Sequence, residues 1–186
     1  MNFRSIALVG LLSWAAFSCE VKKGEIASDN LPYYDLKSFV DLQIQNLGDS
    51  VEVLKTSRID GKENTTEVKY SSQDWKEEFE MFYRADINIP ALSSSYSTET
   101  EQDYLIHRLA PGEKGKVKEL KIRYASDLPV EVSFKMEEEN LFFSTVTFGS
   151  IYMNQSTQKV DHYAIETTQK VVFRKASNIK IEGVIQ

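Results

Sequence analysis

From Gly115 to its end, the chain alternates apolar and polar residues with a period of two, and this pattern constrains the fold more than any other feature. Leu120, Ile122 and Tyr124, for example, are interleaved with charged residues. Such alternation is typical of antiparallel strands that bury one face. The short turns between the segments predict a meander of neighbouring strands. The expected strands lie within residues 119–124, 130–137, 141–153, 160–175 and 179–185.

The strand expected over residues 141–153 has apolar residues on both faces. One face would carry Phe142, Val146, Phe148 and Tyr152, and the other Phe143, Ile151 and Met153. Two interpretations fit this pattern. Either the strand is central, with helices on one side and a pocket or second sheet on the other, or a bulge at Gly149 switches its faces. We favour the bulge.

The N-terminal half carries helix signals. After Asp35, apolar residues recur on one helical stripe as far as Leu47, and Gly48 is a typical C-terminal stop. A second helix is expected after Ser71, because the sequence from Ser71 to Asp74 is a capping box. Its stripe of three aromatic residues is typical of a helix that packs on the core. These residues are Trp75, Phe79 and Phe82.

Between the two helices, the dipeptide Asp60-Gly61 predicts a hairpin turn. We expect its strands over residues 51–59 and 67–70, with residues 62–66 lengthening the loop. Residues 91–101 are expected to form a loop that runs into an edge strand, followed by a strand over 104–109. Together these patterns predict one α+β domain over residues 32–186. It would hold a curved antiparallel meander of about five to seven strands, two packed helices and the N-terminal hairpin.

The first 19 residues resemble the signal peptide of bacterial lipoproteins. Arg4 precedes an apolar segment, residues 6–17, which is shorter than the ~20 residues that a membrane span needs. Residues 16–19, Ala-Phe-Ser-Cys, are similar to a lipobox. The resemblance implies removal of residues 1–18 and lipid attachment to Cys19, the only cysteine, which would hold the protein on a membrane. The alternative is an ordinary signal peptide with a chance cysteine near its cleavage site.

Residues 19–31 have no periodicity and would form a flexible tether after the lipidated cysteine. They lack the run of acidic residues that some surface-displayed lipoproteins carry, which favours the periplasmic side. The expected location is the outer membrane, facing the periplasm. The order of helix, hairpin, helix and meander resembles the half-barrel lipoprotein carriers and receptors of the outer membrane. That resemblance implies an apolar groove between sheet and helices. Its candidate lining residues are Trp75, Phe79, Phe82, Phe142, Val146, Phe148 and Tyr152.

Few residues with catalytic chemistry are present. The net charge of −6 argues against nucleic acid as a partner. The two histidines, His107 and His162, have no cysteine beside them, so we expect no metal site, and no motif for a cofactor is present. Asp49-Ser50-Val51 resembles the short O-glycosylation sequon of a bacterial export-linked system, with Ser50 as acceptor. The alternative is a chance match of three residues.

Three classes of function remain. The first is a lipid-anchored binding or accessory protein of the cell envelope, without catalysis and with an unknown protein partner. The second is a lipid-anchored carrier or receptor for an apolar small molecule in a half-barrel groove. The third is a hydrolase, because a pair of catalytic carboxylates that a sheet brings together leaves no sequence motif. We favour the first class, and a filled space between sheet and helices would support it.

Overall fold

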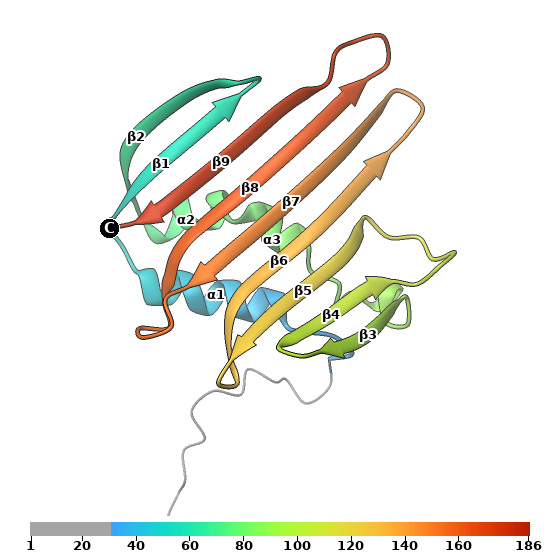
Figure 1. The fold of residues 1–186 in the computed structure, drawn as a ribbon, viewed down its shortest axis with the longest axis horizontal. Helices are drawn as coiled ribbons and strands as arrows, with labels where there is room; N and C mark the ends of the chain where they lie inside the picture. Colours follow the sequence, from blue (N-terminus) through green and yellow to red (C-terminus); the bar gives the residue numbers. More distant parts are fainter. Residues whose placement is uncertain (1–30) are drawn as a thin grey trace, which may run out of the picture.

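The computed structural model describes residues 31–186, and its main element is one open, nine-stranded antiparallel sheet (Figure 1). The order across the sheet is β2-β1-β9-β8-β7-β6-β5-β4-β3. Strands β3 to β9 form a meander, and β1 pairs with β9, which joins the N-terminal hairpin to the last strand. The strands are β1 (Val51–Ile59), β2 (Lys62–Tyr70), β3 (Tyr96–Glu101), β4 (Tyr104–Leu109), β5 (Val117–Ala125), β6 (Leu128–Glu139), β7 (Phe143–Met153), β8 (Val160–Val171) and β9 (Ser177–Ile185).

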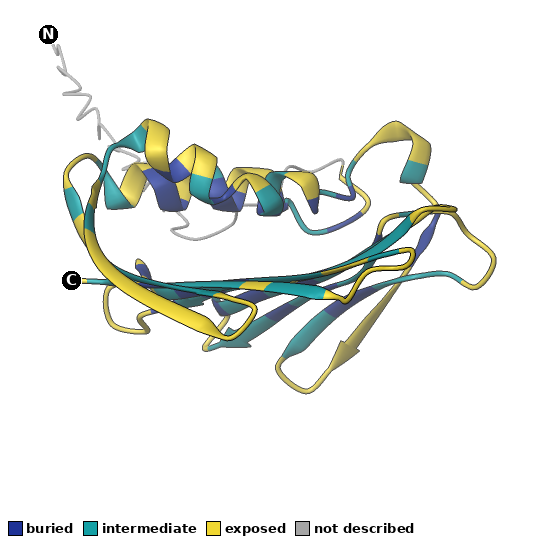
Figure 2. Cartoon of the chain, turned by 90° about the horizontal axis from the view of Figure 1, so that it is seen from above, coloured by how far each residue is buried: buried dark blue, intermediate teal, exposed yellow. Residues whose placement is uncertain are grey.

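The helices lie along one face of the sheet (Figure 2). They are α1 (Leu36–Leu47), α2 (Ser72–Glu78), α3 (Glu80–Arg84) and the 3-10 turn η1 (Pro90–Leu92). Asp35 caps α1 by accepting a hydrogen bond of 2.9 Å from Ser38 N, and Gly48 ends it with a φ of 73°. Ser71 and Asp74 form the predicted capping box of α2. The predicted second helix is interrupted at Phe79, which separates α2 from α3.

One hydrophobic core fills the space between the helices and the sheet. The aromatic stripe of α2 and α3 faces the sheet, as predicted: the Phe79 ring meets Tyr163 of β8 at 5.2 Å between centroids, and Phe82 meets Phe134 of β6 at 5.0 Å. Both contacts are edge-to-face, the favoured geometry for aromatic pairs. Among residues 31–186, the buried core extends from Tyr33 to Ile165 and includes side chains from both the helices and the sheet.

The sheet is larger than the predicted five to seven strands, and the fold is correspondingly richer in sheet than an even α+β arrangement. The predicted hairpin is part of the sheet and does not pack against it as a separate unit. Residues 62–66, predicted as loop, belong to β2, which pairs with β1 from Lys62 to Tyr70. These residues are exposed because β2 is an edge strand, so they carry no apolar alternation from which a strand could be predicted.

The predicted bulge at Gly149 is wrong. Gly149 pairs in regular register with Phe134 of β6 and Ile165 of β8, and β7 keeps its alternation through that point. The glycine serves a close approach instead. A Cβ atom at residue 149 would lie 2.3 Å from the ring of Phe134, so only glycine fits beneath that ring. Strand β7 is therefore a central strand, as in the other interpretation, with helices on one side.

Candidate functional site

The structure does not bring the seven predicted groove residues together. Trp75, Phe79 and Phe82 are fully buried between the helices and the sheet. Val146, Phe148 and Tyr152 occupy the even positions of β7, which point away from the helices, because the odd residues Gly149 and Ile151 are the ones that face the core. Phe142 precedes β7 and is 71% exposed in the turn after β6. No single groove is formed by this set.

The helix-free side of the sheet, called here the open face, is the candidate binding surface. On this face, a row of four apolar or aromatic residues crosses four adjacent strands, and each residue pairs in register with the next. The row consists of Leu54 on β1, Val184 on β9, His162 on β8 and Tyr152 on β7. The rings of Tyr152 and His162 stack at 4.3 Å between centroids. A shallow hollow of about 420 Å³ lies over this row, bordered by Ala164 and by the charged residues Lys180 and Glu182.

Paired charges surround the apolar row. Lys180 and Glu182 form an ion pair at 2.8 Å, and Arg123 and Glu131 form another at 3.1 Å beside Tyr152. Exposed pairs of this kind contribute only ~0–1 kcal/mol each. They keep the open face soluble and discourage pairing with other strands. Burial of the aromatic and aliphatic residues is therefore the larger source of affinity that this face offers a partner.

A second, more buried cluster was not predicted, and it centres on Glu78 at the end of α2. Its carboxylate accepts hydrogen bonds from Lys55 Nζ at 2.7 Å, Tyr70 Oη at 2.9 Å and Tyr163 Oη at 2.8 Å. Burial by itself would lower the pKa of Lys55. The hydrogen bonds to Glu78 and Tyr70 together have the larger effect, so the pKa of Lys55 is raised above its ordinary value. The four residues come from four elements, so no local sequence motif could reveal them. Their geometry holds α2 on the sheet.

The pKa of the Tyr163 hydroxyl is raised above its ordinary value, first by burial and then by the charge of Glu78 and the hydrogen bond to it. A hydroxyl that keeps its proton so firmly is a poor general base. Tyr163 is 1% exposed, and Lys55, Tyr70 and Tyr163 all donate to the one carboxylate of Glu78, so the polar groups of the cluster are engaged with one another. We interpret it as structural.

The two histidines lie far apart in the fold and on different faces. His107 is 2% exposed, accepts a hydrogen bond of 3.1 Å from Tyr34 N, and its pKa is lowered by burial to about 4. His162 lies on the open face beside Asp161, at 2.8 Å. Within residues 31–186, no group of three or more side chains of the metal-binding types comes together.

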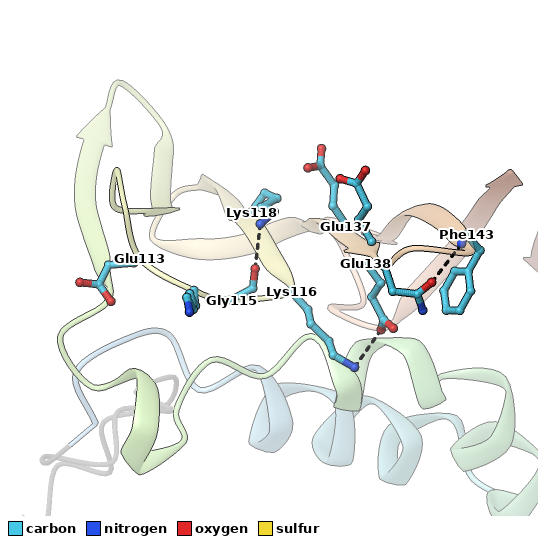
Figure 3. Close-up of a pocket in the computed structure, with 10 residues that line it drawn as sticks. Glu113, Gly115, Lys116, Lys118, Glu137, Glu138 and Phe143 are labelled. Carbon is cyan, nitrogen blue, oxygen red and sulfur yellow. Dashed lines mark hydrogen bonds and ion pairs between the residues drawn. The ribbon is translucent and has the colours of Figure 1, made fainter. Parts of the chain in front are cut away.

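A polar hollow of about 430 Å³ lies between the start of β5 and the end of β6 (Figure 3). Glu138 forms ion pairs with both Lys116 and Arg84 at 3.1 Å, and Lys118 Nζ donates to the carbonyl of Gly115 at 2.8 Å. The cations that line the hollow near Glu138 are thus engaged by the protein itself. Nothing in this arrangement selects one class of ligand.

Of the two predicted modification sites, the structure describes Ser50 but not Cys19. Cys19, the signal peptide and nearly all of the tether lie outside the described residues. Ser50 is exposed on the loop between α1 and β1, with a φ of 65°, so its hydroxyl is on the surface where a sequon would need it. Its neighbour Asp49 instead accepts from Ser72 N and Oγ at 2.7 and 2.8 Å.

The chain matches no protein-family model and no curated protein, and its structure matches no solved structure. None of the helices in the described part of the chain is long and apolar enough to cross a membrane. Interpretation of function therefore depends on the residues and on the geometry above.

Proposed function

We propose that this protein is a lipid-anchored accessory protein of the bacterial cell envelope that binds a partner through the open face of its sheet and catalyses no reaction. The anchor is Cys19, exposed after cleavage of residues 1–18, and residues 19–31 tether the domain to the membrane, on the periplasmic side of the outer membrane. The lipobox-like sequence at residues 16–19 supports this part of the proposal.

The observation that carries the binding role is the one-sided covering of the sheet. Helices bury one face, and on the opposite face the row from Leu54 to Tyr152 and the ring of Phe148 remain partly exposed, with no helix of the described chain over them. A partner that packs on these side chains would remove apolar surface from water without rearranging the fold.

An apolar carrier, the second class of function, is not supported by these contacts. The space in which its groove was expected is occupied by Trp75, Phe79, Phe82, Phe134 and Tyr163, which pack on one another. Two hollows of about 240 and 210 Å³ remain between α2, α3 and the sheet, but neither includes these aromatic residues, and charged side chains such as Arg84, Glu138 and Glu78 border them. We therefore place partner binding on the opposite side.

Photo-cross-linking in cells tests the binding role. A benzophenone amino acid replaces Phe148 on the open face, and in the control it replaces Lys76 on the exposed side of α2. We expect a discrete covalent adduct from residue 148 and none from residue 76, with a lower yield when Val184→Glu is added. Absence of an adduct from residue 148, or equal adducts from both positions, would contradict the proposal.

A further inference from the structure

Two turns at one end of the sheet form an apolar tip, defined here as Leu141, Phe142, Val172 and Phe173. The first two lie between β6 and β7 and the last two between β8 and β9. Figure 1 shows these turns side by side, and Val172 N donates a hydrogen bond of 2.9 Å to Phe142 O. The strands β7 and β8 also pair up to Phe143 and Val171, so the two turns form one unit.

The tip exposes its side chains to an unusual degree. Phe173 is 104% exposed, Leu141 88% and Phe142 71%, and these are the three most exposed large apolar residues of the described chain. Phe173 also has a φ of 63°, a conformation that bulky residues rarely adopt. An exposed turn of this shape would be easier to form with glycine or asparagine. The sequence instead places an aromatic ring there, which indicates a function for the ring outside the fold.

The β8–β9 side of the tip is basic. On the β6–β7 side, Glu137 pairs with Lys135 and Glu138 pairs with Lys116 and Arg84, whereas Glu139 is exposed. Lys170, Arg174 and Lys175 adjoin or lie in the β8–β9 turn, and in residues 31–186 none of them forms an ion pair. Residues 170–176 therefore carry three cations and no acid, in a chain whose net charge is −6. Aromatic and aliphatic side chains beside lysine and arginine are typical of protein segments at the boundary between lipid acyl chains and anionic headgroups.

The backbone of the tip is also suited to a water-poor environment. Asn140 Oδ1 accepts from Phe142 N at 2.8 Å and from Phe143 N at 3.0 Å, and Arg174 N donates to Val171 O at 3.0 Å. These bonds satisfy polar groups that would otherwise resist contact with acyl chains. The turns can therefore bring their side chains to the depth of about 5–10 Å at which interfacial segments lie.

We propose that the apolar tip inserts into the surface of a phospholipid bilayer that contains anionic headgroups, as a second membrane contact in addition to the lipid on Cys19. The inference rests on the proposed envelope location, because it needs a membrane within reach. A stable protein interface buries about 800 Å² of each partner, and two narrow hairpin ends do not offer such a surface. Insertion would orient the domain, since the anchor alone leaves it free to rotate on its tether.

Vesicle binding tests the tip without the anchor. The chain from residue 20 onward keeps every core residue from Tyr33 to Ile165. Its binding is measured by co-sedimentation with phosphatidylcholine vesicles and with vesicles that also contain phosphatidylglycerol. We expect binding to the mixed vesicles, weakened at least tenfold by Phe142→Ser with Phe173→Ser. Ile89→Ser is the matched control, because it removes an exposed apolar side chain from the loop between α3 and η1 and should leave binding unchanged. Thermal unfolding checks that each variant is folded.

Further variants separate charge from insertion. Gln in place of Lys170, Arg174 and Lys175 should reduce binding to the mixed vesicles and abolish their advantage over phosphatidylcholine alone. A tryptophan at residue 173 should show a blue-shifted emission that lipids with brominated acyl chains quench. No binding of the unmutated chain, or equal loss with Ile89→Ser, would overturn the proposal. So would a protein adduct from a cross-linker at residue 173 with no vesicle binding. None of these outcomes changes the cross-linking test of the open face.

Discussion

The ring of Phe134 on β6 lies directly over Gly149 on β7, so closely that a Cβ atom at residue 149 would stand 2.3 Å from Phe134 Cε1. Phe82 holds this ring from the helix side, at 5.0 Å between centroids, so the ring has little freedom to move aside. A glycine on a central strand thus fixes how closely α3 approaches the sheet.

Gly149→Ala is therefore expected to destabilise the protein by ~1–3 kcal/mol, the usual range for overpacking in a core. Chemical denaturation measures the change in the free energy of unfolding. Ser150→Ala is the matched control, because it changes the next residue on the open face and should have an effect below ~0.5 kcal/mol. Equal effects of the two changes would show that the ring of Phe134 is free to move.

Phe79→Ala should lower the free energy of unfolding by ~3–5 kcal/mol, as truncation of a fully buried aromatic side chain does. Its ring contacts Trp75, Phe82 and Tyr163, so the cavity would open at the centre of the core. Lys76→Ala on the exposed side of α2, the helix that Phe79 ends, provides the comparison. A loss below ~1 kcal/mol for Phe79→Ala would mean that α2 is peripheral to the fold.

Alkaline pH should destabilise the protein through Tyr163 and Lys55, whose pKa values are raised in the folded state. A raised folded pKa means that folding favours the protonated form. The contribution to stability is complete below the unfolded pKa, ~10 for both groups, and is lost as the pH rises above it. Tyr163→Phe should flatten the decline in melting temperature above pH ~10, while costing ~1–3 kcal/mol at neutral pH. An unchanged alkaline profile would contradict the assignment.

Acidic pH should destabilise the protein through His107, because burial lowers the pKa of this histidine to about 4. Here the folded state disfavours the charged form, so the contribution is complete above the unfolded pKa of ~6.5 and is lost as the pH falls toward 4. The loss should be of the order of 2–3 kcal/mol. His107→Gln should remove this part of the pH dependence, whereas His162→Gln on the surface should leave it in place. The melting temperature between pH 7 and pH 4 provides the measurement.

Local signals predicted the elements, because each depends on residues close in sequence. Asp35 and Gly48 bound α1, Ser71 and Asp74 cap α2, and apolar alternation marks β5 to β9. What the sequence could not indicate depends on distant pairs. The pairing of β1 with β9 joins Val53 to Ile185, and only this contact brings the hairpin into the sheet.

The candidate sites also divide into features that local sequence predicts and features that depend on residues distant in sequence. The helical period predicted that the aromatic stripe of α2 and α3 would be buried. It did not predict that Phe148 would lie on the opposite face of the sheet, because the face that a β7 residue occupies depends on the strand register. Glu78 and its three donors meet only in the folded chain. The apolar tip needed the structure as well, because residues near Leu141 and Phe173 were expected to continue strands and instead form exposed turns.

The central claim is that the domain works while held on a membrane by Cys19. Mass spectrometry of the N-terminal peptide from membrane-purified protein tests it most directly, alongside fractionation of cells that produce the Cys19→Ser variant. We predict a chain that begins at Cys19 and carries the mass of a lipid modification, and a variant that is soluble or uncleaved. A chain with an unmodified cysteine, or a Cys19→Ser variant that is still cleaved at this site and still sediments with membranes, would contradict the account.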